Sequence, residues 1–441
     1  MKRLLSLLLC AVLALFCATT AQAAGVSITL TASEYALHYA FDAGAQDPFV
    51  ILEYTTPAEK GWMMLYSEDG HFEGDVSLAY SGAGGKTSVA LTSARTTGSI
   101  GKASTTLPKA ADYQKPTGKS NAKVTDFVLT ETPEGFHYAF NAAGTDYMLL
   151  YWRSKEQTVT QPVYPDENGH YEGDVVSELT FARTQFTVQV KSGSGSMKKE
   201  ATVRKGYQVP EAPQRQEGRL SGVTVCIDAG HQENGRFVNE PIGPGLTGST
   251  SGKGGMAQGT KTNRRESIVC LEIGMLLRDE LLRQGANVVM TREDQTTFHT
   301  NIERCEIAEA GGAQIMLRLH CNNSSNRSKR GIQVYGPLNS DYAKAVADAD
   351  TYREMGQKLL DAMKTRVGMT LANSTGMVRL NDHYVGNNWA KMMCFLVEMG
   401  YLSNPAEEYL LVTPVYQQWL AEGMADGVYE IAVARGWVQA Q

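Results

Sequence analysis

The chain has 441 residues, of which 42% are hydrophobic and 20% are charged. This composition is that of a globular protein and excludes the collagen, coiled-coil and disordered classes, and the length exceeds that of a single typical domain. The formal net charge of −6 and the lack of a long Lys/Arg run in the sequence argue against a nucleic-acid-binding protein.

The first 23 residues are typical of a secretory signal peptide. Lys2 and Arg3 precede an apolar run over residues 4–17, and residues 21–23 (Ala-Gln-Ala) form a small-x-small cleavage site. The apolar run is too short to span a bilayer, and no later stretch is apolar enough to do so. We therefore expect a protein that is secreted to the extracellular space or cell wall, with an N-terminal anchor helix as the alternative.

The N-terminal half contains a tandem repeat. Residues 37–41 (Leu-His-Tyr-Ala-Phe) recur as 136–140 (Phe-His-Tyr-Ala-Phe), and residues 69–76 recur as 168–175 (Asn-Gly-His-Tyr-Glu-Gly-Asp-Val). Both copies alternate apolar and polar residues and are broken by Gly- and Asp-rich turns, the pattern of β-sandwiches. We predict two all-β modules of the immunoglobulin or fibronectin type. The sequence leaves open whether they bind glycan, bind a protein or act as spacers.

The segments that join the modules are rich in Pro, Gln, Lys and Gly and predict linkers. The predicted organisation is a signal peptide over 1–23, β-sandwich repeats over 24–108 and 122–207, linkers over 109–123 and 207–222, and a catalytic domain over 222–441. The repeats contain two related pairs of histidines, for which we favour a structural role over metal binding: His38, His71, His137 and His170.

From residue 222 onward, strand-like and helix-like segments alternate, which predicts an α/β fold. The expected strands are 223–227, 287–290, 314–319, 332–335 and 393–397, and the expected helices are 266–284, 301–310 and 342–367. The mature chain keeps an odd number of irregularly spaced cysteines, which predicts neither a disulfide framework nor a Cys-type metal site: Cys226, Cys270, Cys305, Cys321 and Cys394.

Three of the apolar strands end in His231, His320 and Glu398. In open α/β sheets, catalytic groups gather beyond the carboxyl ends of the strands, and two imidazoles with a carboxylate suit a catalytic zinc ion with an open position for water. The alternative is that these are unrelated polar residues at strand ends. Four glutamates lie within reach as a further ligand, and spacing alone does not separate them: Glu233, Glu240, Glu266 and Glu272.

Five stretches of this half form a specific pattern. They are 228–231 (Asp-Ala-Gly-His), 240–245 (Glu-Pro-Ile-Gly-Pro-Gly), 318–322 (Arg-Leu-His-Cys-Asn), 386–389 (Gly-Asn-Asn-Trp) and 397–404 (Val-Glu-Met-Gly-Tyr-Leu-Ser-Asn). In this order and spacing, the segment from about Gly222 to Trp437 resembles the zinc-dependent N-acetylmuramoyl-L-alanine amidases of bacterial cell walls.

The resemblance implies a twisted sheet with helices on both faces and one zinc ion per catalytic domain. It implies His231, Glu266 and His320 as metal ligands and Glu398 as the catalytic residue. Arg304 matches an arginine common in the family, for which the resemblance implies either substrate binding or a structural role. His299 and His383 lie in polar loops, where solvated surface histidine is the default.

The implied reaction is hydrolysis of the amide between N-acetylmuramic acid and L-alanine of the peptidoglycan stem peptides by zinc-activated water, as in an autolysin. Two alternatives remain. One is a non-catalytic wall-binding or scaffold protein with an amidase-like domain, and the other is a zinc peptidase that cuts another bond of the stem peptide.

Overall fold

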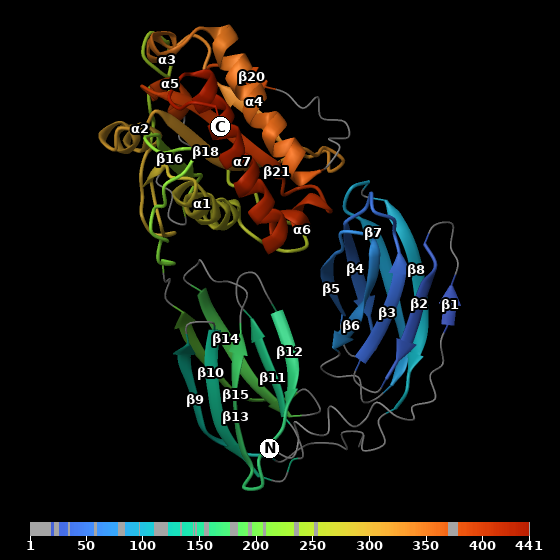
Figure 1. The fold of residues 1–441 in the computed structure, drawn as a ribbon. Helices are drawn as coiled ribbons and strands as arrows, with labels where there is room; N and C mark the ends of the chain where they lie inside the picture. Colours follow the sequence, from blue (N-terminus) through green and yellow to red (C-terminus); the bar gives the residue numbers. More distant parts are fainter. Residues whose placement is uncertain are drawn as a thin grey trace.

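The computed structural model describes residues 19–21, 26–33, 36–56, 60–77, 84–96, 98–109, 122–132, 135–143, 145, 148–153, 158–176, 184–192, 196–205, 209–232, 238–250, 255–368 and 378–440. The expected signal peptide over 1–23 lies outside these residues, apart from the short strand β1 (Thr19–Ala21). Figure 1 shows three parts in chain order, two all-β modules and a C-terminal domain of mixed strands and helices.

The first β-module consists of two facing sheets with the strand orders β1-β2-β3-β6 and β5-β4-β7-β8. Its strands after β1 are β2 (Ile28–Ala32), β3 (Ala36–Asp42), β4 (Phe49–Thr55), β5 (Lys60–Tyr66), β6 (His71–Ser77), β7 (Gly85–Ser93) and β8 (Ser99–Leu107). The alternation predicted from the sequence is real: Leu37, Tyr39 and Phe41 of β3 point into the core between the sheets.

The second β-module has the corresponding strand orders, β13-β10-β9 and β12-β11-β14-β15. Its strands are β9 (Val124–Thr132), β10 (Gly135–Ala142), β11 (Met148–Arg153), β12 (Thr158–Val163), β13 (His170–Val176), β14 (Thr184–Ser192) and β15 (Met197–Lys205). Phe136, Tyr138 and Phe140 of β10 occupy the core positions of their counterparts in β3. The predicted all-β class of both modules is confirmed.

The histidine pairs of the two modules lie on exposed or partly exposed sheet faces and bond across strands. Nδ1 of His38 lies 3.1 Å from Oδ1 of Asp75, and Nδ1 of His137 lies 2.9 Å from Oδ1 of Asp174. His71 and His170 contact Asp42 and Asn141 in the same way. These cross-strand contacts are of the kind that stabilises an antiparallel pair.

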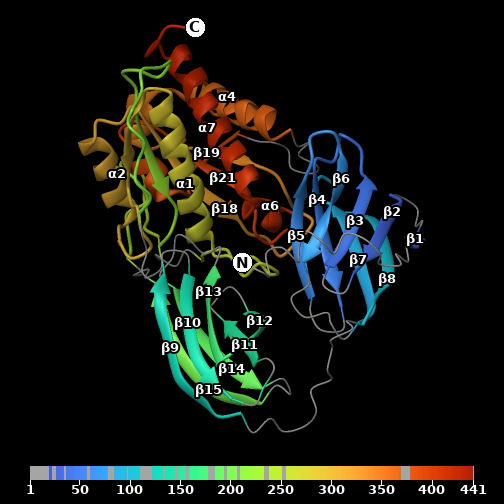
Figure 2. The same ribbon diagram turned by 60° about the horizontal axis from the view of Figure 1, so that its bottom comes forward.

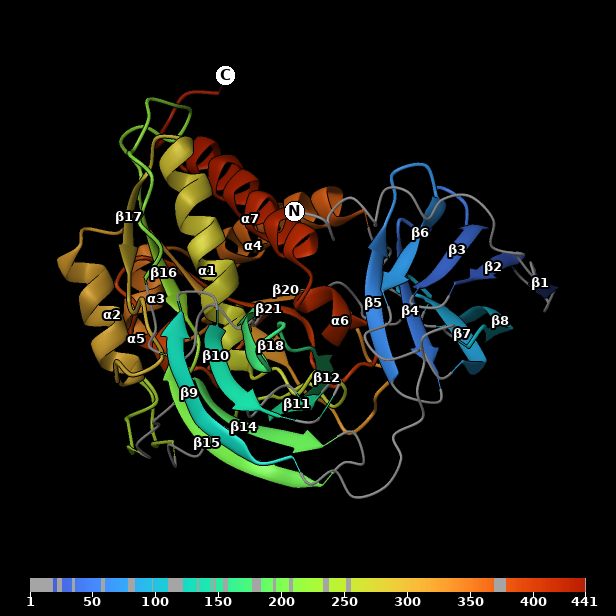
Figure 3. The same cartoon turned by 90° about the horizontal axis from the view of Figure 1, so that it is seen from below.

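The C-terminal domain is built on one mixed sheet with the order β17-β16-β18-β21-β19-β20. Its strands are β16 (Thr224–Ala229), β17 (Asn287–Met290), β18 (Ile315–Asn322), β19 (Gln333–Gly336), β20 (Val378–Leu380) and β21 (Met393–Tyr401). Its helices are α1 (Glu266–Arg283), α2 (Asn301–Ala310), α3 (Asp341–Val346), α4 (Ala349–Val367), α5 (Val385–Trp389), α6 (Glu407–Leu411) and α7 (Pro414–Ala434). Figure 3 shows α1, α4 and α7 on one face of the sheet and α2, α3 and α5 on the other, which confirms the predicted α/β architecture.

The single helix predicted over 342–367 is wrong, because the chain forms α3 and α4 there. Ala347 is extended, with φ −166° and ψ 162°, and Asp348 caps α4 by accepting a hydrogen bond of 2.8 Å from the N–H of Thr351. An N-cap aspartate satisfies one of the free N–H groups of a helix start. The apolar periodicity continues through this break, so the sequence pattern did not reveal that the helix is interrupted.

The segment 209–222, predicted as a linker, has neither strand nor helix but packs along α1. The N–H groups of Gln216 and Leu220 donate to the carbonyls of Leu282 and Gln284, and Nη1 of Arg278 donates to the carbonyl of Pro210. Leu220 is fully buried in the core of the C-terminal domain. This part of the chain is therefore fixed to the domain that follows it.

The first β-module docks on the C-terminal domain next to α6, as Figure 2 shows. Phe49 on the outer face of β4 is 2% exposed and packs on α7, with ring centroids 5.1 Å from Trp419 and 5.9 Å from Tyr416. Trp62 of β5 packs on Tyr409 of α6 at 4.3 Å. Phe49 joins the core of the larger domain, so this module is held by burial and not only by its linker.

Phe49→Ala is expected to lower the free energy of unfolding of the full chain by about 3 kcal/mol, because a buried aromatic ring is lost from the interface. Leu149→Ala is the matched control, since Leu149 lies on the outer face of β11 and is only half-buried. Its substitution is expected to cost less than about 1 kcal/mol. Urea unfolding measures both losses, and equal losses would contradict the docking.

Candidate active site

The carboxyl ends of three neighbouring parallel strands form the candidate site. β18 lies between β16 and β21, and His320 of β18 pairs in register with Glu398 of β21. Both residues lie inside their strands, which continue past the predicted ends. His231 follows β16 by two residues. The sheet therefore brings together the three residues that the strand pattern singled out.

Gly230 allows the two imidazoles to approach each other. A Cβ atom at this position would lie 2.5 Å from the carbonyl oxygen of Leu319 and 2.6 Å from Cε1 of His320. The ring centroids of His231 and His320 are 4.9 Å apart with an interplanar angle of 79°. His231 itself has φ +57°, a left-handed conformation that is uncommon for a non-glycine residue and is found at functional sites.

His231, Glu266 and His320 form a compact cluster of donor atoms. Oε1 of Glu266 lies 3.1 Å from Nε2 of His231 and 3.0 Å from Nδ1 of His320. One ligand atom from each of the three residues lies within 4.8 Å of the others. The N–H groups of Cys321 and Ala257 donate to Oε1 and Oε2 of Glu266 at 3.0 and 2.7 Å, and these bonds fix the orientation of the carboxylate.

The electrostatics of the cluster keep Glu266 ionised. Burial alone would raise the pKa of Glu266, but hydrogen bonds from His231 and His320 outweigh it and hold the pKa well below its usual range. Glu266 is also the first residue of α1, where the helix dipole favours a negative charge. Burial lowers the pKa of His320, so this imidazole is neutral at pH 7 and has a lone pair for a metal ion.

The other glutamates within sequence reach of the histidines have different partners. Glu240 accepts from Asn301 and from the N–H of Ile302 and so caps α2. Glu272 bonds to Arg264 and Gln417. Glu233 lies outside the described residues. Among the described candidates, Glu266 is the one in the donor cluster, a choice that spacing alone did not make.

The carboxyl group of Glu398 lies close to the donor cluster, and its Oε2 is buried. Its Oε2 has no hydrogen-bond partner in the described part of the chain. Burial, and next the nearby Glu266 carboxylate, raise the pKa of Glu398 to about 8. A buried carboxyl group without a partner is costly for stability, and such groups in native proteins are a mark of catalytic sites.

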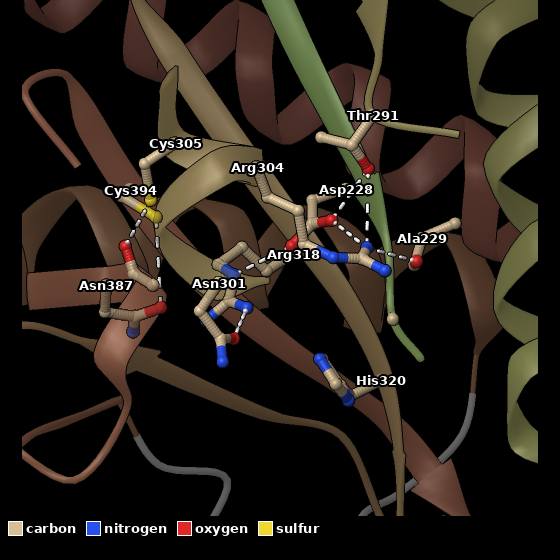
Figure 4. A network of polar contacts seen from close by, with 12 residues as sticks. Asp228, Ala229, Thr291, Asn301, Arg304, Cys305, Arg318, His320, Asn387 and Cys394 are labelled. Atoms are coloured by element: carbon tan, nitrogen blue, oxygen red, sulfur yellow. Dashed lines mark hydrogen bonds and ion pairs between the residues drawn. The ribbon is translucent and has the colours of Figure 1, made fainter. Parts of the chain in front are cut away.

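Arg304 is almost fully buried and lies against the backbone that leads to His231. Its Nη1 contacts Oδ1 of Asp228 at 2.5 Å and the carbonyl of Ala229 at 2.9 Å (Figure 4). Its Nη2 donates to the carbonyl of His231 at 3.2 Å. Further acceptors are the side chain of Gln232 and the carbonyl of His299. These acceptors occupy all five N–H groups, so the geometry favours a structural over a substrate-binding role for Arg304.

Asp228 is the centre of this network, a role that its place in the motif stretch 228–231 did not reveal. It is fully buried, and it accepts from Arg304, from Nε of Arg318 at 2.8 Å and from the hydroxyl of Thr291 at 2.7 Å (Figure 4). Burial alone would raise the pKa of Asp228, but the two arginines hold it well below its usual range. A signal was present: Asp228 and Arg318 are charged residues within apolar strands, which require partners when buried.

Arg292 was missed by the sequence analysis, and it links the loop of His231 to the start of α1. Its guanidinium donates to the carbonyls of Ala229 and Gly230 at 2.8 Å and to the carbonyl of Ser267 at 2.7 Å. This arginine therefore fixes the backbone beside His231 relative to the residue after Glu266.

The donor cluster opens into a cavity of about 680 Å³. His231, Glu266, His320 and Glu398 line it together. His299 and His383, expected as solvated loop residues, line it as well. The cavity is large enough for a segment of a peptide or sugar chain rather than only a small ion.

Residues 225–430 match the family described as N-acetylmuramoyl-L-alanine amidase. This segment is an N-acetylmuramoyl-L-alanine amidase domain. The fold of the amidase domain and the order of its motifs agree with the resemblance found in the sequence.

The amidase domain has relatives in Bacillus subtilis and Staphylococcus aureus. The chain is 26% identical over 231 residues to the germination-specific N-acetylmuramoyl-L-alanine amidase of Bacillus subtilis, covering 49% of this chain and 83% of that protein. It is 27% identical over 235 residues to the probable cell wall amidase LytH of Staphylococcus aureus, covering 52% of this chain and 72% of that protein. Among solved structures, the amidase Ami1 of Mycobacterium abscessus aligns with a TM-score of 0.44 and 21% identity, over 48% of this chain and 99% of that one.

Two expectations from the sequence concern the cysteines and membrane-spanning segments. The five cysteines outside the predicted signal peptide are buried and free. Within the described ranges, none of the helices combines the length and apolar character that a membrane span requires.

Proposed function

We propose that this protein is a secreted, zinc-dependent amidase that hydrolyses the bond between N-acetylmuramic acid and L-alanine in peptidoglycan. One observation carries the proposal: Glu398, whose buried Oε2 has no partner among the described residues, shares a cavity with the donor cluster of His231, Glu266 and His320. The family of the amidase domain and the names of its relatives support the choice of bond.

The donor cluster suits zinc. Two imidazole nitrogens and one carboxylate oxygen are a donor set found at catalytic zinc sites, which keep one position open. His231, Glu266 and His320 would hold the ion through the atoms that now converge on Oε1 of Glu266. When bound, zinc activates a water molecule and polarises the scissile carbonyl group.

In this proposal Glu398 moves the proton. Its ionised carboxylate accepts a proton from the attacking water, and the resulting acid donates that proton to the departing amine of L-alanine. Burial gives the group a raised affinity for a proton, and a cation held by the neighbouring cluster lowers it again toward neutral pH. Such a pKa suits one group that serves as base and then as acid.

Arg304 and Arg292 act as positioning residues. Together they hold the carbonyls of Ala229, Gly230 and His231, and so they keep the imidazole of His231 opposite Glu266. Fixed ligands favour metal binding because little conformational entropy is lost when the ion enters.

The remaining parts of the chain fit export to the wall. Residues 1–23 serve as the signal peptide, and the domains extend over 24–108, 122–207 and 222–441 in our proposal. Peptidoglycan outside the cell is then the partner of the mature enzyme. The first β-module supports the catalytic domain structurally, since part of its outer face is buried against that domain.

Metal binding is tested with Glu266→Gln. The purified wild-type protein is expected to hold one zinc ion per chain, and a chelator is expected to abolish peptide release until zinc is restored. Glu266→Gln removes one ligand and is expected to weaken zinc binding by more than about 100-fold. Competition with a chromophoric chelator measures the affinity.

Glu272→Gln is the matched control for this measurement. Glu272 is also a buried glutamate of α1, but it bonds to Arg264 and Gln417 instead of the histidines. The control variant is expected to bind zinc like the wild type. If Glu266→Gln also binds zinc with wild-type affinity, the proposed ligand set is wrong.

A further inference from the structure

A second cavity adjoins the cavity of the donor cluster, and we call it the arginine groove. Its volume is about 490 Å³, and it is lined by Tyr335, Arg379, Leu380, Asn381, His383 and Tyr384. His383 and Tyr384 line both cavities. The two cavities therefore meet at these two side chains, and we call the route from one to the other the path.

The sheet register places this path across three strands. Leu396 of β21 pairs with Tyr335 of β19, and Tyr335 pairs with Arg379 of β20. Paired residues in a sheet share a face, and Leu396 lies on the same face of β21 as Glu398. Glu398, Tyr335 and Arg379 thus lie on one side of the sheet, the side of the cavities.

The same register gives the length of the path. Arg379 lies on β20, two strands away from β21. It is level with Leu396 of β21, which is two residues before Glu398. With strands about 4.8 Å apart and a rise of about 3.3 Å per residue, the two Cα atoms are roughly 12 Å apart. An extended peptide covers that distance in about four residues, and the long arginine side chain shortens it.

The walls of the arginine groove suit a peptide. The rings of Tyr335 and Tyr384 are 5.1 Å apart and form an aromatic surface beside the junction. Arg379 is exposed and forms no ion pair with any residue that the structure describes. The nearest acid in the sequence, Asp382, is instead bonded by both the main chain and the side chain of Asn339 at 2.7 Å.

We propose that Arg379 binds a free carboxylate of the stem peptide, within about four residues of the scissile amide. The inference rests on the proposed function, because it takes the stem peptide as the substrate. A guanidinium group binds a carboxylate through two parallel hydrogen bonds, which gives both affinity and orientation. Arg379 is then a residue that sets specificity, since it distinguishes stem peptides with a free acid from those with an amide at that position.

The test compares zinc-loaded wild type, Arg379→Gln and Arg379→Lys on synthetic muramoyl peptides whose carboxylates are amidated one at a time. Arg379→Gln is expected to raise KM by about ten- to a hundredfold for the fully acidic substrate, with kcat within twofold. Amidation of one particular carboxylate is expected to raise the KM of the wild type by the same factor and to leave the variant unaffected. Arg379→Lys keeps the positive charge but not the planar guanidinium group, so its KM is expected to lie between those of the wild type and Arg379→Gln.

Arg353→Gln is the control, since Arg353 is an exposed arginine of α4 whose partner is Asp350. An effect of Arg379→Gln that is the same on acidic and amidated substrates would overturn the proposal, and so would no effect at all. The affinity of the free stem peptide, measured by calorimetry, gives a second readout that needs no turnover. If the wild type cuts none of the substrates, the proposed function fails, while a loss of peptide affinity in Arg379→Gln still supports the groove.

Discussion

Glu398→Gln is expected to slow the release of stem peptides by about 10²- to 10⁴-fold, the usual size of a general acid–base contribution. The amide keeps the shape of the side chain but neither accepts nor delivers the proton. Because Glu398 is not in the donor cluster, zinc content and zinc affinity are expected to stay at wild-type values. Single-turnover kinetics on purified peptidoglycan and metal analysis of the same sample provide both measurements.

The stability of this variant separates a catalytic from a structural role. Burial disfavours the ionised form of Glu398, and Oε2 has no partner among the described residues, so a neutral side chain is expected to leave the melting temperature unchanged or raised. The raised pKa means that the folded state binds the proton more tightly than the unfolded state, so the cost of Glu398 grows as the pH rises through about 8. The gain from Glu398→Gln in metal-free protein is therefore expected to be larger at high pH. Slow release together with lost zinc or a lowered melting temperature would contradict the role of Glu398.

Asp228→Asn is expected to destabilise the amidase domain by about 3–5 kcal/mol, because it leaves two buried arginines without their counter-charge. For a domain of this size that loss corresponds to a drop in melting temperature of roughly 6–20 °C. Asp228 has a strongly lowered pKa in the folded state, so the stability it contributes at neutral pH is lost as the pH falls below the ordinary pKa of an aspartate. Calorimetry between pH 3 and 7 measures both effects.

A surface ion pair provides the matched control for the buried network. Glu309 contacts Lys391 at 2.9 Å, and both side chains are nearly half exposed. Glu309→Gln is expected to cost less than about 1 kcal/mol. Asp228→Asn is also expected to weaken zinc binding, since Arg304 holds the carbonyl of His231 and is itself held by Asp228. Equal losses of stability for the two variants would show that the buried network does not support the site.

Much of the fold could be predicted because its pattern is local. Period-two alternation revealed both β-modules, and apolar runs revealed the parallel strands whose ends hold His231, His320 and Glu398. The break between α3 and α4 was missed because a capping residue, Asp348, interrupts the helix without interrupting its apolar stripe. The docking of Phe49 was not predictable either. From the sequence, an apolar residue of a strand is assigned to the core of its own module, and only the folded structure shows that Phe49 packs on another domain.

The residues of the site likewise differ in whether a local sequence pattern predicts them. The two histidines and Glu398 follow from strand ends, but the choice of Glu266 needed either the family resemblance or the folded backbone, because several glutamates had similar spacing. Arg304 was identified without a settled role, and its acceptors come from segments far apart in the chain. The lone charges inside apolar strands, Asp228 and Arg318, are the one signal in the sequence that could have revealed the network.

The central claim is the bond that the enzyme cuts, and end-group analysis of digested peptidoglycan tests it most directly. Zinc-loaded mature protein is incubated with purified peptidoglycan, and the new N-termini are labelled and identified. We expect new L-alanine N-termini that appear with time and are absent with a chelator. New N-termini of another amino acid would contradict the assigned bond and indicate a zinc peptidase. If zinc-loaded protein produces no new N-termini, the proposed catalytic activity is contradicted and a wall-binding scaffold is favoured.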